Sequence, residues 1–433
     1  MLNAGYPMLN RRHFLRHMAG YSLMALPGLQ FVQGLAAAAP QLKKQGKSLI
    51  LLWMSGGPPT IDMWDLKPGQ ATGGDFKTRK TTVPGIDVSE YLPLVGKQMK
   101  NLAIVRSLVT NEGDHNRGRV LMHTGRTPSP IVTYPSLGSL VSYQLTPKEL
   151  ALPGFISVGR PADGPGFLGM NYAPFTVQNP GMAPANIRPP DTVGADKDRM
   201  YRRERLFYSV EDRFIDSVHN GIKKDPHSEA AKAHSDIYKK AFSLVVSPLG
   251  DVFTFNNEKK STLDAYGPST FGKGCLLARR LVEKGVTCVE VDMGGWDLHQ
   301  NCQGSLVRML PTLDKGMGTL VSDLVQRGLW KNTVVLWMGE FGRTPRINQN
   351  AGRDHWARCW SVVVGGGGIK GGQAFGSTDE DGTSVKDEPV SVGDLFATVF
   401  KGLGLDPALQ IRDNLGRPLG IAPDKSTAIK ALV

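Results

Sequence analysis

Short apolar runs that stop at glycine divide the chain into segments typical of buried β-strands. Ser48 to Met54 and Thr333 to Met338 are the clearest runs, and glycine follows each within two residues. Runs of this length bounded by glycine are typical of strands that are buried on both faces. Similar patterns predict further strands at 101–108, 155–158, 286–291 and 361–364.

Helical periodicity is clearest between residues 306 and 324, where leucine and methionine recur every three or four positions. Pro311 inside this pattern predicts either a kink or a later start of the helix. Other helices are predicted at 135–144, 271–284 and 392–403. Strands that alternate with helices indicate an α/β fold around a mostly parallel sheet.

The middle of the chain has a different composition and reads as an insertion. Residues 162–191 are rich in glycine and proline, which predicts a long loop, and residues 199–241 are highly charged with a helical pattern. We therefore expect a loop and a charged helical insertion over about 162–260 on the surface of one large domain, residues 39–433.

The first forty residues resemble an export signal. Asn10 to Arg16 carries the paired arginines followed by Phe-Leu of a twin-arginine signal, and a weakly apolar stretch and a small-residue cleavage site follow. We expect residues 1–38 to be a signal peptide, either cleaved or kept as an anchor, that engages the twin-arginine export machinery. The competing interpretation is a basic N-terminal helix of the folded domain. No segment after it is apolar over enough residues to span a membrane, so the mature protein is expected to be periplasmic or extracellular.

Charge and cysteine content narrow the classes of partner. The formal net charge of +12 falls to about +9 when residues 1–38 are removed, and the charges are dispersed. This favours a solvated surface over nucleic-acid binding, while permitting weak attraction to an anionic or sulfated polysaccharide. The four cysteines lack CxxC spacing, so two disulfides and buried free thiols both remain open.

Acidic residues and histidines concentrate in four segments, three of which follow predicted strands. Ligands of open α/β sheets bind outside the carboxyl ends of the strands, so we expect these segments to converge. Carboxylates and imidazoles without thiolates suit one or two divalent ions, such as zinc, manganese or calcium, better than a structural zinc finger. The expected metal ligands are Asp62, Asp297, His299, Glu340, Asp354 and His355.

Arginines in the same segments are candidates for binding a tetrahedral oxyanion, which matches a guanidinium group well. Arg119 is the strongest of these, whereas Arg126 and Arg343 also have a plain interpretation as turn residues. The glycine-rich stretch from Gly366 to Gly371 formally matches a dinucleotide fingerprint. No helix pattern follows it, and the fingerprint requires that helix, so we reject a dinucleotide site.

Five motifs in order resemble the domain-of-unknown-function family 1501, and they cover nearly the whole mature chain. They are LLWMSGGPPTIDMWDLKPG, DHNRGRVLMHTGR, MGGWDLHQN, MGEFGRTP and AGRDHW. That family is distantly similar to the alkaline phosphatase and sulfatase superfamily. The resemblance implies a three-layer α/β/α domain and chemistry on phosphate or sulfate esters.

The resemblance to sulfatases can be followed residue by residue. Sulfatases have arginine four residues and Thr-Gly nine and ten residues after their nucleophile; counted from His115, these positions hold Arg119, Thr124 and Gly125. The nucleophile position is therefore a histidine, which excludes the formylglycine mechanism. The late Asp-His-Gly of sulfatases is replaced by an acid followed by Phe341 and glycine, so one metal ion is a better expectation than two.

His115 has three interpretations, in order of preference: a metal ligand, a general base for an activated water, or a phosphohistidine-type nucleophile. We group it with Asn116 and Arg119 as the expected catalytic residues. The leading hypothesis is an exported, metal-dependent hydrolase of phosphate or sulfate esters. The alternative is an inactive relative that binds anionic glycans or a cell-surface partner, and phosphomutase-type transfer ranks last.

Overall fold

The computed structural model describes residues 46–185, 187, 197–219, 235, 238, 241, 242, 244, 245 and 248–433. The predicted signal peptide and much of the predicted insertion lie outside the described residues. The longest described helix of the insertion is α5 (Lys197–His219). None of the described helices is both long and apolar enough to cross a membrane.

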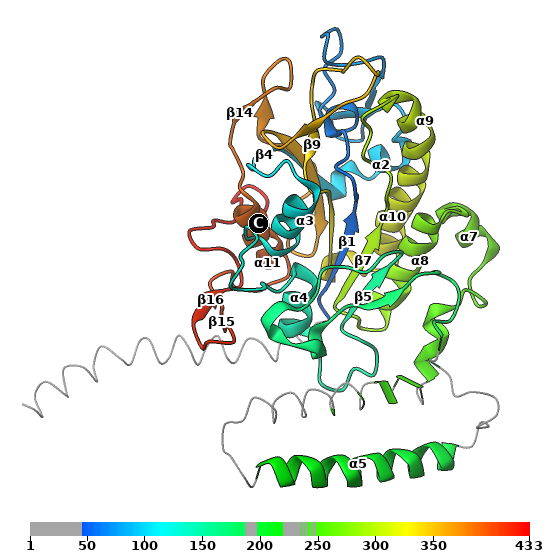
Figure 1. Cartoon of the computed structure of the whole chain (residues 1–433). Helices are drawn as coiled ribbons and strands as arrows, with labels where there is room; N and C mark the ends of the chain where they lie inside the picture. The colour runs from blue at the N-terminus through cyan, green and yellow to red at the C-terminus, as the bar shows by residue number, and fades with distance from the viewer. Residues whose placement is uncertain are drawn as a thin grey trace, which may run out of the picture. The chain divides into compact units, whose positions relative to one another are not determined.

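An eight-stranded sheet forms the centre of the domain, in the order β12-β4-β11-β8-β1-β7-β5-β6 (Figure 1). In chain order its strands are β1 (Ser48–Trp53), β4 (Leu102–Leu108), β5 (Phe155–Val158), β6 (Phe175–Val177), β7 (Cys288–Asp292), β8 (Thr333–Met338), β11 (Trp360–Gly366) and β12 (Gln373–Phe375).

The sheet is mostly parallel, as the alternation of strands and helices predicts. β1 pairs in parallel with β7 and β8, β5 pairs in parallel with β7, and β11 alone runs antiparallel to its neighbours β8 and β4. The predicted strands all exist, with ends that shift by at most two residues. β6 was missed because it lies within a glycine- and proline-rich stretch that was predicted to be loop.

Helices cover both faces of this sheet, which explains why its strands are apolar at most positions rather than only at alternate ones. α8 (Thr270–Glu283) packs on the face that carries Val291, and α4 (Leu137–Leu145) packs on the opposite face against Phe155. α11 (Val392–Gly402) lies on the α4 side (Figure 1). The described residues therefore form the expected three layers. The shorter α2 (Pro93–Lys97) and α7 (Lys260–Tyr266) lie with α8.

The long helical pattern at 306–324 is two helices joined by a π-helical turn. α9 (Cys302–Leu313) contains Pro311, the π segment spans Asp314–Gly318, and α10 (Thr319–Gln326) continues. Of the two alternatives for Pro311, the later start is wrong, because the helix begins at Cys302. The irregularity appears instead just after Pro311, where the Asp314 carboxylate accepts the backbone N–H groups of Leu94 and Val95.

Helix α3 (His115–Thr124) is not among the helices predicted from the sequence. Asp114 caps it by accepting the N–H of Arg117, and Gly125 ends it with a φ of 72°. Both signals are readable in the sequence, but the first turns are polar and contain Gly118. Short two-stranded ribbons surround the sheet: β2–β3 (Thr78–Lys80, Asp87–Ser89), β9–β10 (Gly342–Arg343, His355–Trp356), β13–β14 (Ser377–Thr378, Val385–Asp387) and β15–β16 (Gln410–Arg412, Pro418–Gly420).

Candidate metal site

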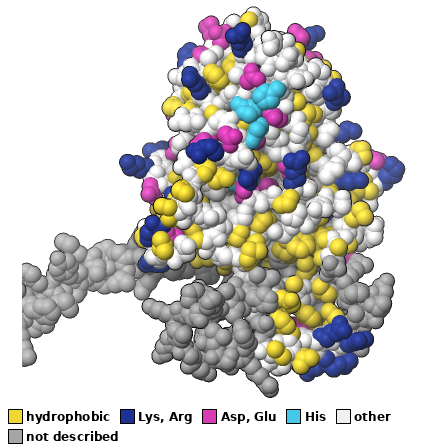
Figure 2. Space-filling model, viewed as in Figure 1, with side chains coloured by type: hydrophobic (Ala, Val, Ile, Leu, Met, Phe, Trp, Pro, Cys, Tyr) yellow, Lys and Arg dark blue, Asp and Glu magenta, His cyan; other side chains and the backbone are white. Residues whose placement is uncertain are grey.

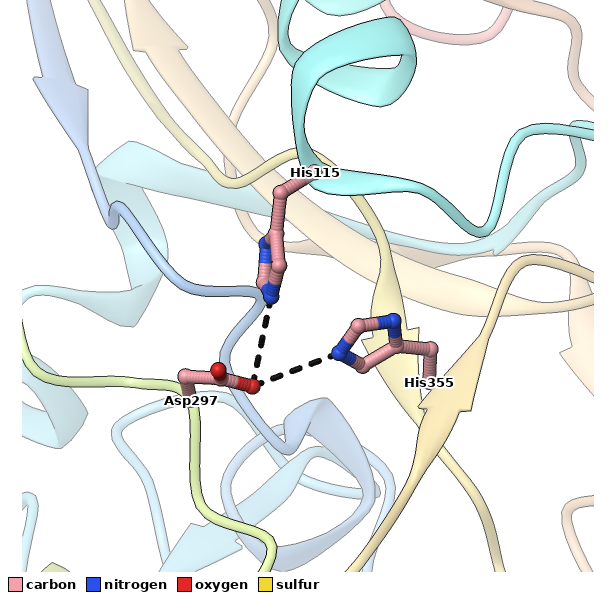
Figure 3. A group of neighbouring side chains, drawn as sticks. All are labelled: His115, Asp297 and His355. Carbon is pink, nitrogen blue, oxygen red and sulfur yellow. Dashed lines mark hydrogen bonds and ion pairs between the residues drawn. The ribbon is translucent and has the colours of Figure 1, made fainter.

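The topology brings the four chemistry-bearing segments to one edge of the sheet. β1, β4, β7 and β8 run in the same direction, so the residues that follow them meet at their carboxyl ends. Asp297 follows β7, Glu340 follows β8, and His115 begins α3 after β4. His355 comes from β10, and Figure 3 shows it pointing with His115 toward Asp297.

Asp297 lies at the centre of the cluster, because three imidazole nitrogens face one of its oxygens. Its Oδ1 is 3.3 Å from Nε2 of His115 and 3.3 Å from Nε2 of His355. The same oxygen is 3.0 Å from Nε2 of His299. His299 Nε2 also lies 3.0 Å from His355 Nε2. Four residues from three separate segments therefore direct one atom each toward a common point.

In two of these imidazoles, Nδ1, the nitrogen that does not face Asp297, donates a hydrogen bond. His355 Nδ1 is 2.8 Å from the carbonyl oxygen of Gly113, which can only accept, so Nδ1 carries the proton. His299 Nδ1 is 2.8 Å from Asp354 Oδ1 and donates to it. Neutral rings protonated at Nδ1 have a lone pair on Nε2, so the 3.0 Å contact between these rings opposes two lone pairs. A proton or a cation between them removes that repulsion.

His115 is oriented in the same way by Glu340. The distance from His115 Nδ1 to Glu340 Oε1 is 2.7 Å, and the same oxygen accepts the backbone N–H of Gly56 at 2.9 Å. His115 Nε2 is buried and makes no hydrogen bond to a described residue, although it faces Asp297. A buried polar atom without a partner costs free energy, and either a proton shared with Asp297 or a cation would satisfy this one.

The arrangement fits a tetrahedral divalent cation. Ligand atoms 2.0–2.1 Å from a tetrahedral zinc ion lie about 3.3 Å from one another. The contacts of Asp297 Oδ1 with the three Nε2 atoms, and the contact between His299 and His355, are 3.0–3.3 Å. One ligand atom each from His115, Asp297 and His355 lie within 4.8 Å of one another. Histidines that bind metals also donate their second N–H to a carboxylate or carbonyl, as all three imidazoles do here.

Arg343 holds the central carboxylate in place. Its buried guanidinium donates to the carbonyl of Gly57 at 2.8 Å, to that of Arg353 at 3.1 Å, and to Asp297 Oδ1 at 2.5 Å. Burial raises the pKa of Asp297, but hydrogen bonding and charge from Arg343 outweigh it and hold that pKa well below its usual range. Asp297 is therefore anionic, as a metal ligand must be.

Two of the imidazoles that face Asp297, those of His115 and His355, have pKa values shifted in opposite directions. The hydrogen bond to Glu340 raises the pKa of His115, whereas burial lowers the pKa of His355. His355 is therefore neutral at pH 7 and has a free lone pair. A cation that binds His115 Nε2 would displace a proton from it.

The site is open to solvent. The Asp297 side chain is 48 % exposed and that of His299 is 42 % exposed, while His115 is 34 % exposed. Figure 2 shows the histidine side chains gathered in one surface patch with acidic and basic side chains beside them. A site of this kind is accessible to a large substrate as well as to a small one.

Close packing of backbone around Gly56 fixes the distance between two of the contributing loops. Gly56 has a φ of +115°, and a Cβ there would lie 2.6 Å from the backbone nitrogen of Asp297. We expect Gly56→Ala to lower the free energy of unfolding by more than about 3 kcal/mol, because backbone strain of about 1–3 kcal/mol adds to a clash with a backbone that cannot move. Urea denaturation measures the loss.

Gly69 offers a matched control for this substitution. It also has a positive φ, +82°, but a Cβ would have nothing within 4 Å. Gly69→Ala should therefore cost only the strain of the left-handed conformation, about 1–2 kcal/mol. Equal losses for the two variants would show that the contact between the Gly56 and Asp297 loops is unimportant.

Two of the expected metal ligands lie behind the imidazoles rather than beside Asp297. Glu340 and Asp354 each bind the outer nitrogen of an imidazole and do not face the point beside Asp297 Oδ1. Asp62 lies apart from the cluster. Both of its oxygens are bound by the Arg353 guanidinium at 2.7 and 2.8 Å, and neither side chain is exposed. We therefore assign Asp62 to a buried ion pair, which the sequence interpretation did not foresee.

The other two expected catalytic residues on α3, Asn116 and Arg119, do not lie in the cluster around Asp297. Asn116 is exposed in the first turn of the helix. The Arg119 guanidinium contacts Asp163 instead of Asp297. Arg126 donates to the carbonyl of Gly420 at 2.9 Å, which agrees with the plain interpretation of a structural turn residue. Of the arginines considered, Arg343 reaches the cluster. Its place in the motif GEFGR, directly after the predicted strand 333–338, was the sequence signal that could have identified it.

Most of the chain matches the model of a known protein family. Residues 46–433 match the family described as "Protein of unknown function (DUF1501)". The chain belongs to this family. No curated protein matches it. The family residues include every member of the cluster described above, since all of them lie between 113 and 355.

Solved structures similar to this family member include sulfatases and an alkaline phosphatase. Ps i-CgsB is 13 % identical over 83 % of this chain and 72 % of its own, with a TM-score of 0.39. The PsFucS1 sulfatase from Pseudoalteromonas sp. is 13 % identical over 86 % and 70 %, with a TM-score of 0.38. The alkaline phosphatase of the Antarctic bacterium TAB5 is 11 % identical over 83 % and 98 %, with a TM-score of 0.34. At these TM-scores the likenesses carry no weight for the chemistry of this chain.

A second ionic cluster surrounds His123, near the end of α3. The side chain is buried, with Nδ1 3.0 Å from Asp163 Oδ2 and Nε2 3.3 Å from Glu290 Oε1. Nδ1 is also 3.0 Å from the carbonyl of Arg119, and the ring packs 4.0 Å from that of Trp53. Burial lowers the pKa of His123, but the two carboxylates outweigh it and raise that pKa to about 10.

This cluster predicts a pH dependence of stability. The pKa of His123 rises from 6.5 in the unfolded chain to about 10 in the folded one. The stabilisation is therefore complete below pH 6.5 and is lost as the pH rises to about 10, with a slope of up to about 1.4 kcal/mol per pH unit. Denaturation of the wild type and His123→Gln across this window measures it. The variant should show the flatter curve, and two parallel curves would contradict the assignment.

Proposed function

We propose that this protein is an exported hydrolase of phosphate or sulfate esters that depends on one divalent cation. The observation that carries the proposal is the convergence of Nε2 from His115, His299 and His355 on Asp297 Oδ1. The protonation of Nδ1 in His299 and His355 supports it, because it directs two lone pairs at one point, and His115 would add a third when its Nε2 loses its proton. The sulfatase-like spacing of Arg119, Thr124 and Gly125 after His115 supports the choice of esters.

The donor set favours some cations over others. Three imidazole nitrogens and one carboxylate suit zinc, and manganese less well, whereas calcium prefers six to eight oxygen ligands. We therefore propose zinc or manganese and set calcium aside. A bound cation would supply Lewis-acid polarisation of an ester oxygen.

The protein's own residues have distinct tasks in this proposal. Four side chains hold the cation, and Arg343 fixes the carboxylate among them. Glu340 fixes the ring of His115, whose two nitrogens are then both committed. His115 is accordingly a ligand, which was the first of its three interpretations, and is not available as a nucleophile. We expect water to attack the ester directly, without a covalent enzyme intermediate.

The test is hydrolysis by the purified mature chain. A panel of phosphate and sulfate esters is assayed with the protein as isolated, after chelation, and after addition of zinc or manganese. We expect release of phosphate or sulfate that chelation stops and the cation restores. Hydrolysis that survives complete chelation would contradict the proposal.

The alternative is a binding protein for an anionic glycan or a cell-surface partner. The histidine at the superfamily's nucleophile position favours it, because no hydroxyl or thiol stands there to form a covalent intermediate. A protein that retains stoichiometric cation but hydrolyses no ester of the panel would support this alternative. Binding to sulfated polysaccharide, measured with and without the cation, would then identify the partner class.

Export through the twin-arginine route is a separate proposal supported by Arg11 and Arg12. Replacing both arginines by lysine in the full-length chain should leave the protein in the cytoplasm, because the paired arginines are the recognised feature. Cell fractionation measures the distribution. An unchanged distribution would show that these residues do not form the signal.

A further inference from the structure

Helix α3 rests on the domain at two points. Near its start, Gly118 lies directly on the loop after β8, where a Cβ would be 3.2 Å from the Phe341 ring and 3.3 Å from the Glu340 carbonyl. Near its end, His123 enters the ionic cluster with Asp163 and Glu290. His115 is the first residue of the same helix.

The His123 contacts join α3 to three strands. Glu290 belongs to β7, Trp53 belongs to β1, and Asp163 follows β5. The segments after β1 and β7 carry Gly56 and Asp297, which are parts of the candidate metal site. Arg119, one turn before His123, also binds Asp163. The end of α3 that lies away from the cation site is therefore fixed to the strands that carry the site.

Both nitrogens of His123 face groups that accept hydrogen bonds, so the ring is held as a cation. Nδ1 faces a carboxylate and a backbone carbonyl, and Nε2 faces the Glu290 carboxylate. Removal of this charge leaves the carboxylates of Asp163 and Glu290 facing each other across a buried space with less compensation. The end of α3 would then shift.

A shift at this end moves His115 because a helix is stiff. Gly118 is the pivot, with about 7.5 Å of helix between it and His123 and about 4.5 Å between it and His115. A displacement of 1 Å at His123 thus moves His115 by about 0.6 Å. Functional groups must be held within about 0.5 Å of their productive position, so a shift of this size is enough to impair the site.

We propose that His123 is a positioning residue: a buried cation, held by Asp163 and Glu290, that fixes α3 and so places His115 Nε2 against Asp297. The inference rests on the proposed cation site, to which His123 itself contributes no atom.

The first test is cobalt binding by the mature chain after chelation, measured by calorimetry. His123→Gln should weaken cobalt binding at least tenfold, the lower end of the loss that outer partners of metal ligands cause. Should this variant fail to fold, Glu290→Gln keeps a hydrogen-bond acceptor while removing one charge, and it should weaken binding in the same direction. Wild-type affinity in the folded variant would overturn the proposal.

Arg279 offers a matched control for general destabilisation. It is likewise a buried cation, 2 % exposed, and it binds Glu258, Glu283 and Asp323 within or beside α8. Arg279→Gln should lower the melting temperature without changing cobalt affinity. An equal loss of cobalt affinity in this control would overturn the proposal, because the effect would then be that of a weakened fold.

Crystal structures of the metal-free wild type and His123→Gln, or Glu290→Gln if needed, separate this inference from the proposed function. We expect α3 to shift by about 0.5 Å or more at His115 and the 2.7 Å contact with Glu340 to be lost. If the wild type binds no cobalt, the proposed cation site fails, and these structures alone decide whether His123 positions α3. An unmoved His115 would overturn the positioning role.

Discussion

Asp297→Asn is expected to abolish retention of the cation, with the dissociation constant for zinc or cobalt rising by more than about a hundredfold, beyond the loss caused by outer partners of ligands. Asp297 Oδ1 is the atom that all three Nε2 nitrogens face. Asparagine has the same shape but lacks the negative charge. The fold should persist, because the side chain is half-exposed and Arg343 keeps its carbonyl acceptors.

Asp354→Asn is the matched control for this prediction. Asp354 is exposed to a similar degree and belongs to the same cluster, but it binds the outer nitrogen of His299. An asparagine oxygen still accepts that hydrogen bond, so the expected loss of affinity is at most about tenfold, the low end for an outer partner. Calorimetric titration of both chelated variants measures the difference. Equal losses would contradict the distinction between ligand and partner.

Arg353→Met is expected to lower the free energy of unfolding by about 3–5 kcal/mol. Arg353 and Asp62 are completely buried, and the substitution leaves the Asp62 carboxylate without a counter-charge. Arg353 also donates to the carbonyls of Thr344 at 3.0 Å and Thr72 at 2.9 Å, which lose their donor. Urea denaturation measures the change.

The double variant Arg353→Met/Asp62→Leu tests the cause. Replacing both charges by apolar groups of similar size often costs little, because no charge then remains buried. We expect the double variant to regain much of the stability lost by the single one. A single variant within about 1 kcal/mol of the wild type would show that the pair is weak, as exposed pairs are.

The sequence predicted the sheet well because its strands are buried on both faces. Such strands are continuous apolar runs, and those at β5 and β8 have the predicted ends. β6 and α3 were missed for physical reasons. β6 is three residues long at the edge of the sheet, and α3 is held by its caps and by contacts of Gly118 and His123, which no periodicity reveals.

The residues of the site were easier to predict than their roles. The strand order places Asp297, Glu340 and His115 at one edge, which the apolar runs already indicated. Residue type does not say whether a carboxylate faces a cation or the outer nitrogen of a histidine. That distinction depends on tertiary contacts, such as the one between Glu340 and Gly56. Asp62 illustrates the limit, because its partner Arg353 lies 291 residues away.

A crystal structure of the cobalt- or zinc-loaded protein, with anomalous scattering recorded at the metal edge, tests the central claim most directly. We predict one strong peak about 2.0–2.1 Å from Asp297 Oδ1 and from Nε2 of the three histidines. A protein that takes up no cation, or a peak bound by other residues, would contradict the account.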